Sequence, residues 1–87
     1  MFYRKRQTDE VTLAEAAPGC YEIVGMTGAE VCGRLRRLGV KVGDRIEVIK
    51  SGPGPVIFLK GNTRIGIGRG LAAAITVKSV RSPDEAV

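Results

Sequence analysis

The apolar residues between Glu30 and Leu38 recur with the period of a helix. Val31, Leu35 and Leu38 stand at i, i+4 and i+7, so all three lie on one helical face. We expect this face to be buried, with Leu35 and Leu38 in the hydrophobic core. Gly39 follows at once and can adopt the left-handed conformation that closes a helix. The pattern therefore predicts a short helix over Glu30–Leu38.

After a turn, the pattern changes to that of a strand. Within Arg45–Lys50 the apolar residues Ile46 and Val48 alternate with charged ones, which predicts a strand with one buried face. Gly61 and Asn62 form a two-residue hairpin signal, so the strands before and after them should run antiparallel. The remaining apolar runs predict strands over Cys20–Thr27, Val56–Lys60, Thr63–Ile67 and Ala74–Val80.

Two short helical turns complete the expected elements. Thr12 can cap a turn over Leu13–Ala17, with Glu15 completing a capping box and Leu13 docking the turn on the core. Arg69–Ala73 has room for a single turn before the last strand. About five short strands, with one short helix between the first and second, predict an all-β fold: an SH3-like small β-barrel.

The glycines of the second half mark an open strand face. Arg64, Gly66 and Gly68 share the outer side of their strand, which leaves backbone exposed where another element or a partner could lie close. Gly66, Gly68 and Gly70 do not match a dinucleotide-binding loop, because no full helix follows them. Gly25, within the first strand, predicts a β-bulge or a close backbone approach.

The length of 87 residues fits one domain. We expect a mobile basic tail over 1–10, the barrel over 11–80 and a frayed C-terminus over 81–87. The longest uncharged run, Ser51–Leu59, is far shorter than the roughly 18 apolar residues of a membrane helix. No apolar stretch follows the basic start of the chain, so we expect no secretory signal and a cytoplasmic location.

The basic residues define the candidate partner surface. Fourteen Lys and Arg against nine Asp and Glu give a net charge of +5, which favours anionic partners. Arg34, Arg36, Arg37 and Lys41 project from the predicted helix and the turn after it, and we take them as partner-binding candidates. The three arginines point at different angles around the helix, so they do not form one stripe. Nucleic acid remains an alternative partner, supported by the net charge and the basic cluster at 4–6.

The chemistry available to the chain is limited. The sequence has no histidine, and nothing in it pairs carboxylates or a nucleophile with a base, so we expect no enzyme. Cys20 and Cys32 are metal-ligand candidates for a divalent transition metal such as ferrous iron, but two cysteines alone do not complete a zinc site. Half-buried thiols, or a metal shared across a dimer interface, are the other interpretations. Asp44 and Glu47 should point to opposite strand faces and cannot chelate together.

Three blocks of the chain resemble the ferrous iron transport protein A (FeoA) family. They are LAEAAPGCYEIVGM, RLRRLGVKVGDRIEV and TRIGIGRGLAAAITV, and in this order they cover nearly everything from Thr12 to Lys78. The resemblance implies an SH3-like module without catalytic activity. Asn62, the basic tail, Cys20 and Cys32 lie outside the family's pattern.

The resemblance also implies a partner. Members of this family act in the cytoplasm as accessories of the membrane ferrous iron transporter, whose cytosolic part is a GTPase, and this chain would modulate or assemble that transporter without inserting into the membrane itself. The same barrel occurs as the last domain of iron-dependent repressors of the diphtheria toxin type. A stand-alone metal-responsive domain related to that repressor domain is therefore a further alternative.

Overall fold

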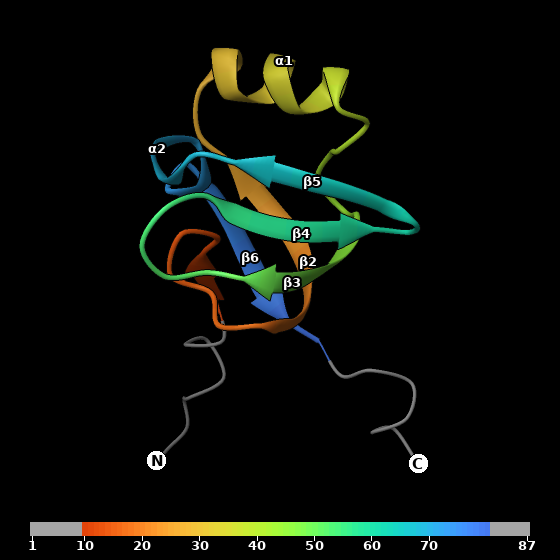
Figure 1. The fold of residues 1–87 in the computed structure, drawn as a ribbon. Helices are drawn as coiled ribbons and strands as arrows, with labels where there is room; N and C mark the ends of the chain where they lie inside the picture. The colour runs from red at the N-terminus through yellow and green to blue at the C-terminus, as the bar shows by residue number, and fades with distance from the viewer. Residues whose placement is uncertain (1–9, 81–87) are drawn as a thin grey trace, which may run out of the picture.

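The computed structural model describes residues 10–80 and builds them into one antiparallel sheet of six strands with two helices (Figure 1). Along the chain the elements are β1 (Glu10–Thr12), β2 (Gly19–Met26), α1 (Ala29–Arg37), β3 (Arg45–Lys50), β4 (Val56–Lys60), β5 (Thr63–Ile67), α2 (Arg69–Ala72) and β6 (Ile75–Ser79). The strand order is β1-β6-β2-β3-β4-β5, so the sheet has two edges, β1 and β5, and is not closed into a full barrel. The predicted all-β class with one short helix between strands is confirmed.

The first strand was not predicted from the sequence. β1 pairs antiparallel with β6, with Val11 opposite Val77. The predicted helical turn over Leu13–Ala17 does not form; instead the Glu15 N–H donates to the Thr12 carbonyl at 3.0 Å in a tight turn. Leu13 is nevertheless fully buried, as expected. Most of the predicted tail and all of the predicted C-terminal end lie outside the described residues, although Glu10 belongs to β1.

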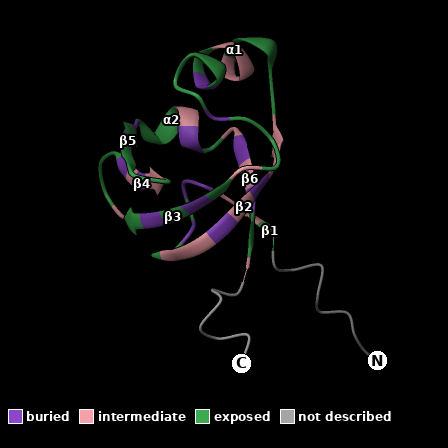
Figure 2. Ribbon diagram, turned by 90° about the vertical axis from the view of Figure 1, so that its right-hand side faces the viewer, coloured by how far each residue is buried: buried purple, intermediate pink, exposed green. Residues whose placement is uncertain are grey.

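Alternating residues of the strands fill the core. The largest fully buried side chains are Phe58, Leu13, Ile23, Leu35 and Ile75. Apolar burial of this kind contributes about 1.5 to 3 kcal/mol for each large side chain. In Figure 2 buried segments alternate with intermediate and exposed ones along the strands.

The helix α1 stands over the end of the sheet next to β5 and is largely exposed (Figures 1 and 2). Leu35 is its one buried residue, as predicted. The prediction that Leu38 is a core residue is wrong, because 47% of its surface is exposed. Leu38 follows the last helical residue, and Gly39, at φ 84°, reverses the chain immediately after it. Leu38 therefore lies at the end of the helix, beside the core.

The predicted hairpin and the predicted irregularity in the first long strand both form. The hairpin at Gly61 and Asn62 places Lys60 opposite Thr63. The predicted irregularity at Gly25 is a shift in register between β2 and β6. A second shift, between Val48 and Lys50, leaves Ile49 40% exposed, which explains why it departs from the alternation of β3.

Candidate functional site

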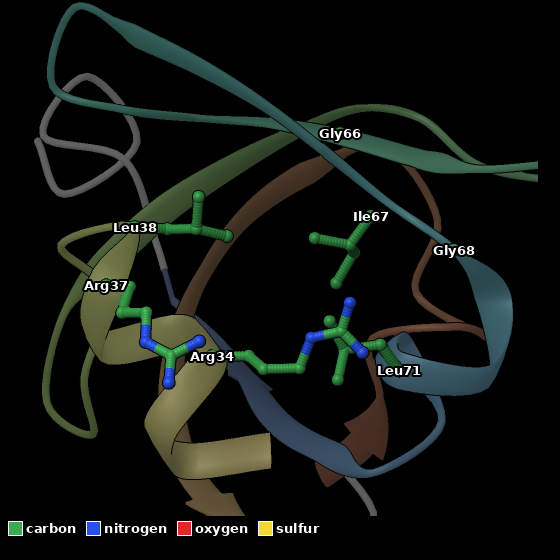
Figure 3. A pocket seen from close by; sticks show the side chains of 7 residues that line it. All are labelled: Arg34, Arg37, Leu38, Gly66, Ile67, Gly68 and Leu71. Carbon is green, nitrogen blue, oxygen red and sulfur yellow. The ribbon is translucent and has the colours of Figure 1, made fainter. Parts of the chain in front are cut away.

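A groove of about 340 Å³ separates α1 from β5 and α2 (Figure 3). Three of its lining residues lie in the C-terminal half of α1 or directly after it, and the others lie at the end of β5, between β5 and α2, and in α2 itself. We call it the α1–β5 groove. Its lining residues are Arg34, Arg37, Leu38, Gly66, Ile67, Gly68 and Leu71.

Two arginines form the cationic side of the α1–β5 groove. Arg34 and Arg37 are three positions apart on α1, so they share one side of the helix. In Figure 3 the Arg34 side chain extends across the groove toward Ile67 and Leu71. Both arginines are exposed, and no ion pair within residues 10–80 involves either of them. Their charge is therefore available to a partner.

The opposite side of the groove is apolar and has little side-chain bulk. Ile67 is 5% exposed and forms part of the core, and Leu71 is half-buried. Gly66 and Gly68 are exposed and carry no side chains that would fill the space between β5 and α1. The predicted open face of this strand is confirmed at these two glycines.

The other two partner-binding candidates face a different hollow. Arg36 and Lys41 line a depression of about 250 Å³ together with Cys32 and Met26. The structure thus divides the four basic candidates into two pairs on two sides of α1. The interpretation that the arginines form no single stripe holds for Arg36, whereas Arg34 and Arg37 are brought together.

Asp44 orders the turn that follows α1. Its carboxylate accepts the Lys41 backbone N–H at 2.9 Å and lies 3.1 Å from the side-chain nitrogens of both Lys41 and Lys60. Desolvation raises the pKa of Asp44, but the hydrogen bonds from the Lys41 backbone and from the two lysine side chains outweigh it and lower the pKa to about 2. Asp44 is therefore a structural ion-pair residue, a role that the sequence did not predict.

The cysteines lie on different elements. Cys20 is in β2 and Cys32 in α1, and both are half-buried free thiols. Within residues 10–80, no three cysteine, aspartate or glutamate residues come together as a metal site. Metal binding by Cys20 or Cys32 stays a prediction.

The aromatic residues of the described chain are not exposed for base stacking. Phe58 is fully buried and Tyr21 is 9% exposed, with its hydroxyl donating to the Ala17 carbonyl at 2.7 Å. Single-stranded nucleic acids are usually held by exposed aromatic rings together with basic grooves. The described surface offers the basic part of such a site without the aromatic part.

Sequence reasoning missed the apolar half of the α1–β5 groove. Leu38 stands at the helical spacing that places it on the same face as Leu35. It is exposed because the helix ends one residue before it. Leu71 lies in a single helical turn that has no period of its own. The signal that was available is the pair Gly66 and Gly68 on the outer side of β5.

Solved structures with the same SH3-like fold include an FeoA protein and a manganese-activated repressor. The chain is similar to an iron uptake regulatory protein, FeoA, whose crystal structure it matches with 34% sequence identity, covering 82% of this chain and 99% of that one at a TM-score of 0.74. The manganese-activated repressor ScaR matches at a TM-score of 0.75 with 22% identity, over 80% of this chain and 35% of that one. At that identity the second likeness shows the fold alone.

Sequence comparison then identifies the family. The chain belongs to the FeoA domain family, whose pattern it matches over residues 11–79. An assigned Fe(2+) transport protein A from Methanocaldococcus jannaschii is 42% identical over 50 residues, which cover 54% of this chain and 61% of that relative. The match therefore spans about three fifths of the relative's length. The resemblance noted in the sequence is confirmed.

Proposed function

We propose that this protein is an accessory module of ferrous iron uptake, which docks onto the cytosolic, GTPase-linked part of a membrane ferrous iron transporter. Membership of the FeoA family and the similarity to an Fe(2+) transport protein support the link to iron. The observation that carries the docking proposal is the state of α1. This helix buries only Leu35 and presents arginines without ion-pair partners in residues 10–80, beside the exposed Leu38.

The composition of this surface suits a protein partner. Arginine is enriched in interface hot spots, and binding is strongest where anchoring side chains are shielded from water by their surroundings. Leu38 supplies an apolar contact, and Arg34 and Arg37 flank the groove next to it. An acidic surface on the transporter would be attracted over a distance and oriented by the arginines, so charge would raise the rate of association.

The surface is held in place before binding. Leu35 fixes α1 on the core, Gly39 closes the helix, and Asp44 ties the following turn to Lys41 and to Lys60 on β4. Ordering this side of the interface therefore costs little free energy when a partner binds.

Docking can change the transporter by favouring one of its conformations. A bound module shifts a conformational equilibrium only as far as it binds one state more tightly than the other. No helix in the described part of the chain is long and apolar enough to cross a membrane. In this proposal the module acts by contact with the transporter's cytosolic part, where it modulates or assembles the transporter.

Uptake of radioactive ferrous iron by cells that lack the chain tests this function. The unaltered chain should restore uptake, and Arg34→Glu combined with Arg37→Glu should not. A control, Lys50→Glu, reverses the charge of an exposed strand residue away from the groove and should restore uptake. Normal uptake with a folded Arg34→Glu/Arg37→Glu chain would refute docking through this surface.

A further inference from the structure

We infer that the α1–β5 groove binds an extended segment of its partner in which acidic and aliphatic residues alternate, and that this segment pairs with β5 as an added antiparallel strand. The inference deepens the docking proposal and rests on it only for the identity of the protein that carries the segment. The chemistry of the segment follows from the edge of the sheet and from the groove's lining.

The register of the hairpin determines which backbone groups of β5 are free. Lys60 and Thr63 close a two-residue loop, so they form a hydrogen-bonded pair, and such pairs alternate with non-hydrogen-bonded ones along an antiparallel ladder. Arg64 and Gly66 therefore occupy non-hydrogen-bonded positions opposite β4. Their N–H and C=O groups point away from β4, toward the free edge of the sheet.

That edge has no partner within residues 10–80. β5 is the last strand in the sheet order, and no hydrogen bond described outside the strand ladders involves the backbone of Arg64 or Gly66. Figure 1 shows β4 on one side of β5 and α1 on the other, so the free edge faces the helix. An unpaired strand edge of this kind is a template for a further strand.

The space beside the edge matches a short peptide. β5 has five residues, which extend over about 17 Å in a strand, the length of a penta- or hexapeptide. The volume of about 340 Å³ is at the lower end of the range for binding pockets, roughly 300 to 1,000 Å³. Gly66 contributes no side chain, so a second backbone can approach β5 closely at that point.

The groove's charge selects acidic residues. Arg34 and Arg37 are the only charged residues among those that line it, and they lack carboxylate partners within residues 10–80. Arginine binds carboxylates with paired, charge-assisted hydrogen bonds. The net charge of +5 adds a favourable long-range attraction.

The groove's apolar residues select aliphatic side chains at alternate positions. Leu38, Ile67 and Leu71 form the apolar part of the lining. Successive side chains of a strand point to opposite sides, so a segment can direct aliphatic groups at these residues and carboxylates at the arginines. Proline-rich ligands do not fit this arrangement, because proline lacks the N–H that would pair with the carbonyl of Gly66, and the lining has no aromatic residue.

Titration of the full chain with an acetylated, amidated hexapeptide of alternating leucine and glutamate tests the inference. We expect saturable binding, and slower exchange of the Arg64 and Gly66 amide hydrogens in the complex. A hexapeptide of alternating leucine and lysine should bind at least tenfold more weakly. Equal binding of the two peptides, or unchanged exchange at both amides, would overturn the inference.

A pair of variants isolates the backbone contact. Gly66→Ala adds a Cβ that would lie 3.9 Å from Ile57, an ordinary contact, and keeps the N–H. Gly66→Pro removes the N–H, and an edge strand tolerates proline where its N–H faces away from the ladder. We expect Gly66→Pro to weaken binding at least tenfold relative to Gly66→Ala. Equal affinities in the two variants would contradict strand addition.

Modified peptides give the same test without altering the protein. N-methylation of alternate residues blocks the N–H groups on one edge of the peptide, and shifting the methyl groups by one residue blocks the other edge. One of the two methylated peptides should bind and the other should not. Equal binding of both methylated peptides would overturn the inference. It would also be overturned if an oligonucleotide, or a second copy of the chain, displaced the leucine–glutamate peptide from the groove.

The same variants separate this inference from the docking proposal. If the transporter binds the Gly66→Pro and Gly66→Ala chains equally well and loses only the Arg34→Glu/Arg37→Glu chain, docking holds and strand addition is wrong. If the peptide binds as expected and the transporter does not bind at all, the groove's specificity stands and the proposed function fails.

Discussion

The side-chain nitrogen of Lys60 lies 3.1 Å from a carboxylate oxygen of Asp44, which joins β4 to the turn between α1 and β3. The same lysine donates a hydrogen bond to the Gly39 carbonyl at the end of α1. These contacts fasten the C-terminal end of the helix to the sheet. The position of the arginine-bearing helix thus depends on an ion pair that lies outside the groove.

Replacing Asp44 with asparagine should destabilise the fold. The carboxylate accepts hydrogen bonds from the backbone and side chain of Lys41, and hydrogen bonds to charged groups contribute about 1.5 to 3 kcal/mol. We expect a loss of about 1 to 3 kcal/mol in the free energy of unfolding at pH 7, measured by urea denaturation. Glu47→Gln, at an exposed position of β3, is the control and should have little effect.

The contribution of Asp44 should also depend on pH. Folding lowers the pKa of Asp44 from 3.8 to about 2, so its contribution is fully present above pH 4 and is lost as the pH falls from about 4 toward 2. Urea denaturation across this range should show the unaltered chain and the Asp44→Asn chain converging in stability. A constant difference down to pH 2 would contradict the assigned role.

Arg69 should stabilise the fold through contacts that are distant in sequence. Its guanidinium donates hydrogen bonds to the Gly52 carbonyl and, at 3.0 Å, to the Ala14 carbonyl. Arg69→Ala leaves both carbonyls without this donor and should cost about 1 to 3 kcal/mol in denaturant unfolding. Arg36→Ala removes an exposed arginine from α1 and should change stability by no more than about 0.5 kcal/mol. Equal effects of the two substitutions would show that the Arg69 contacts contribute nothing.

Leu35 and Leu38 should behave differently although the sequence gives them the same helical period. Leu35 is fully buried, so Leu35→Ala should lower the free energy of unfolding by about 2 to 5 kcal/mol. Leu38 is 47% exposed, so Leu38→Ala should cost less than about 1 kcal/mol and should weaken binding to the groove instead. Thermal unfolding and peptide titration of both variants measure this difference. Similar losses of stability would place Leu38 in the core.

Alanine substitutions at Gly39 and at Gly33 should change the stability of the chain in opposite directions. Gly39 has a φ of 84°, which alanine adopts only with strain, so Gly39→Ala should destabilise the chain by about 1 to 2 kcal/mol. Gly33 lies within α1 with open space where a Cβ would stand, so Gly33→Ala should stabilise the chain by about 0.5 to 1 kcal/mol. The midpoint of urea denaturation checks both, and a stabilising Gly39→Ala would refute the assigned helix stop.

Local features of the fold were accessible from the sequence. Arg45–Lys50 forms a strand with the predicted bounds, because its alternation is a local property. The hairpin at Gly61 and Asn62 follows from turn chemistry of the same kind. The strand β1 was missed because three residues have no measurable period, and Val11 finds its partner Val77 only through the tertiary fold.

The candidate site could be predicted only in part. The open face at Gly66 and Gly68 and the basic character of α1 are visible in the sequence. The glycine face and the arginines of α1 meet in one groove because of the direction in which the helix runs. That direction is determined by the turn after Gly39 and by the ion pairs of Asp44. For the same reason, the sequence could not separate Arg36 from Arg34 and Arg37.

The most direct test of docking is the dissociation constant between the purified chain and the purified cytosolic part of a ferrous iron transporter from the same cells. Calorimetry should give a defined complex at moderate salt, weakened at least tenfold by Arg34→Glu combined with Arg37→Glu. The Lys50→Glu control should bind as the unaltered chain does. No complex, or equal affinity in all three chains, would contradict the assignment of α1 as the docking surface.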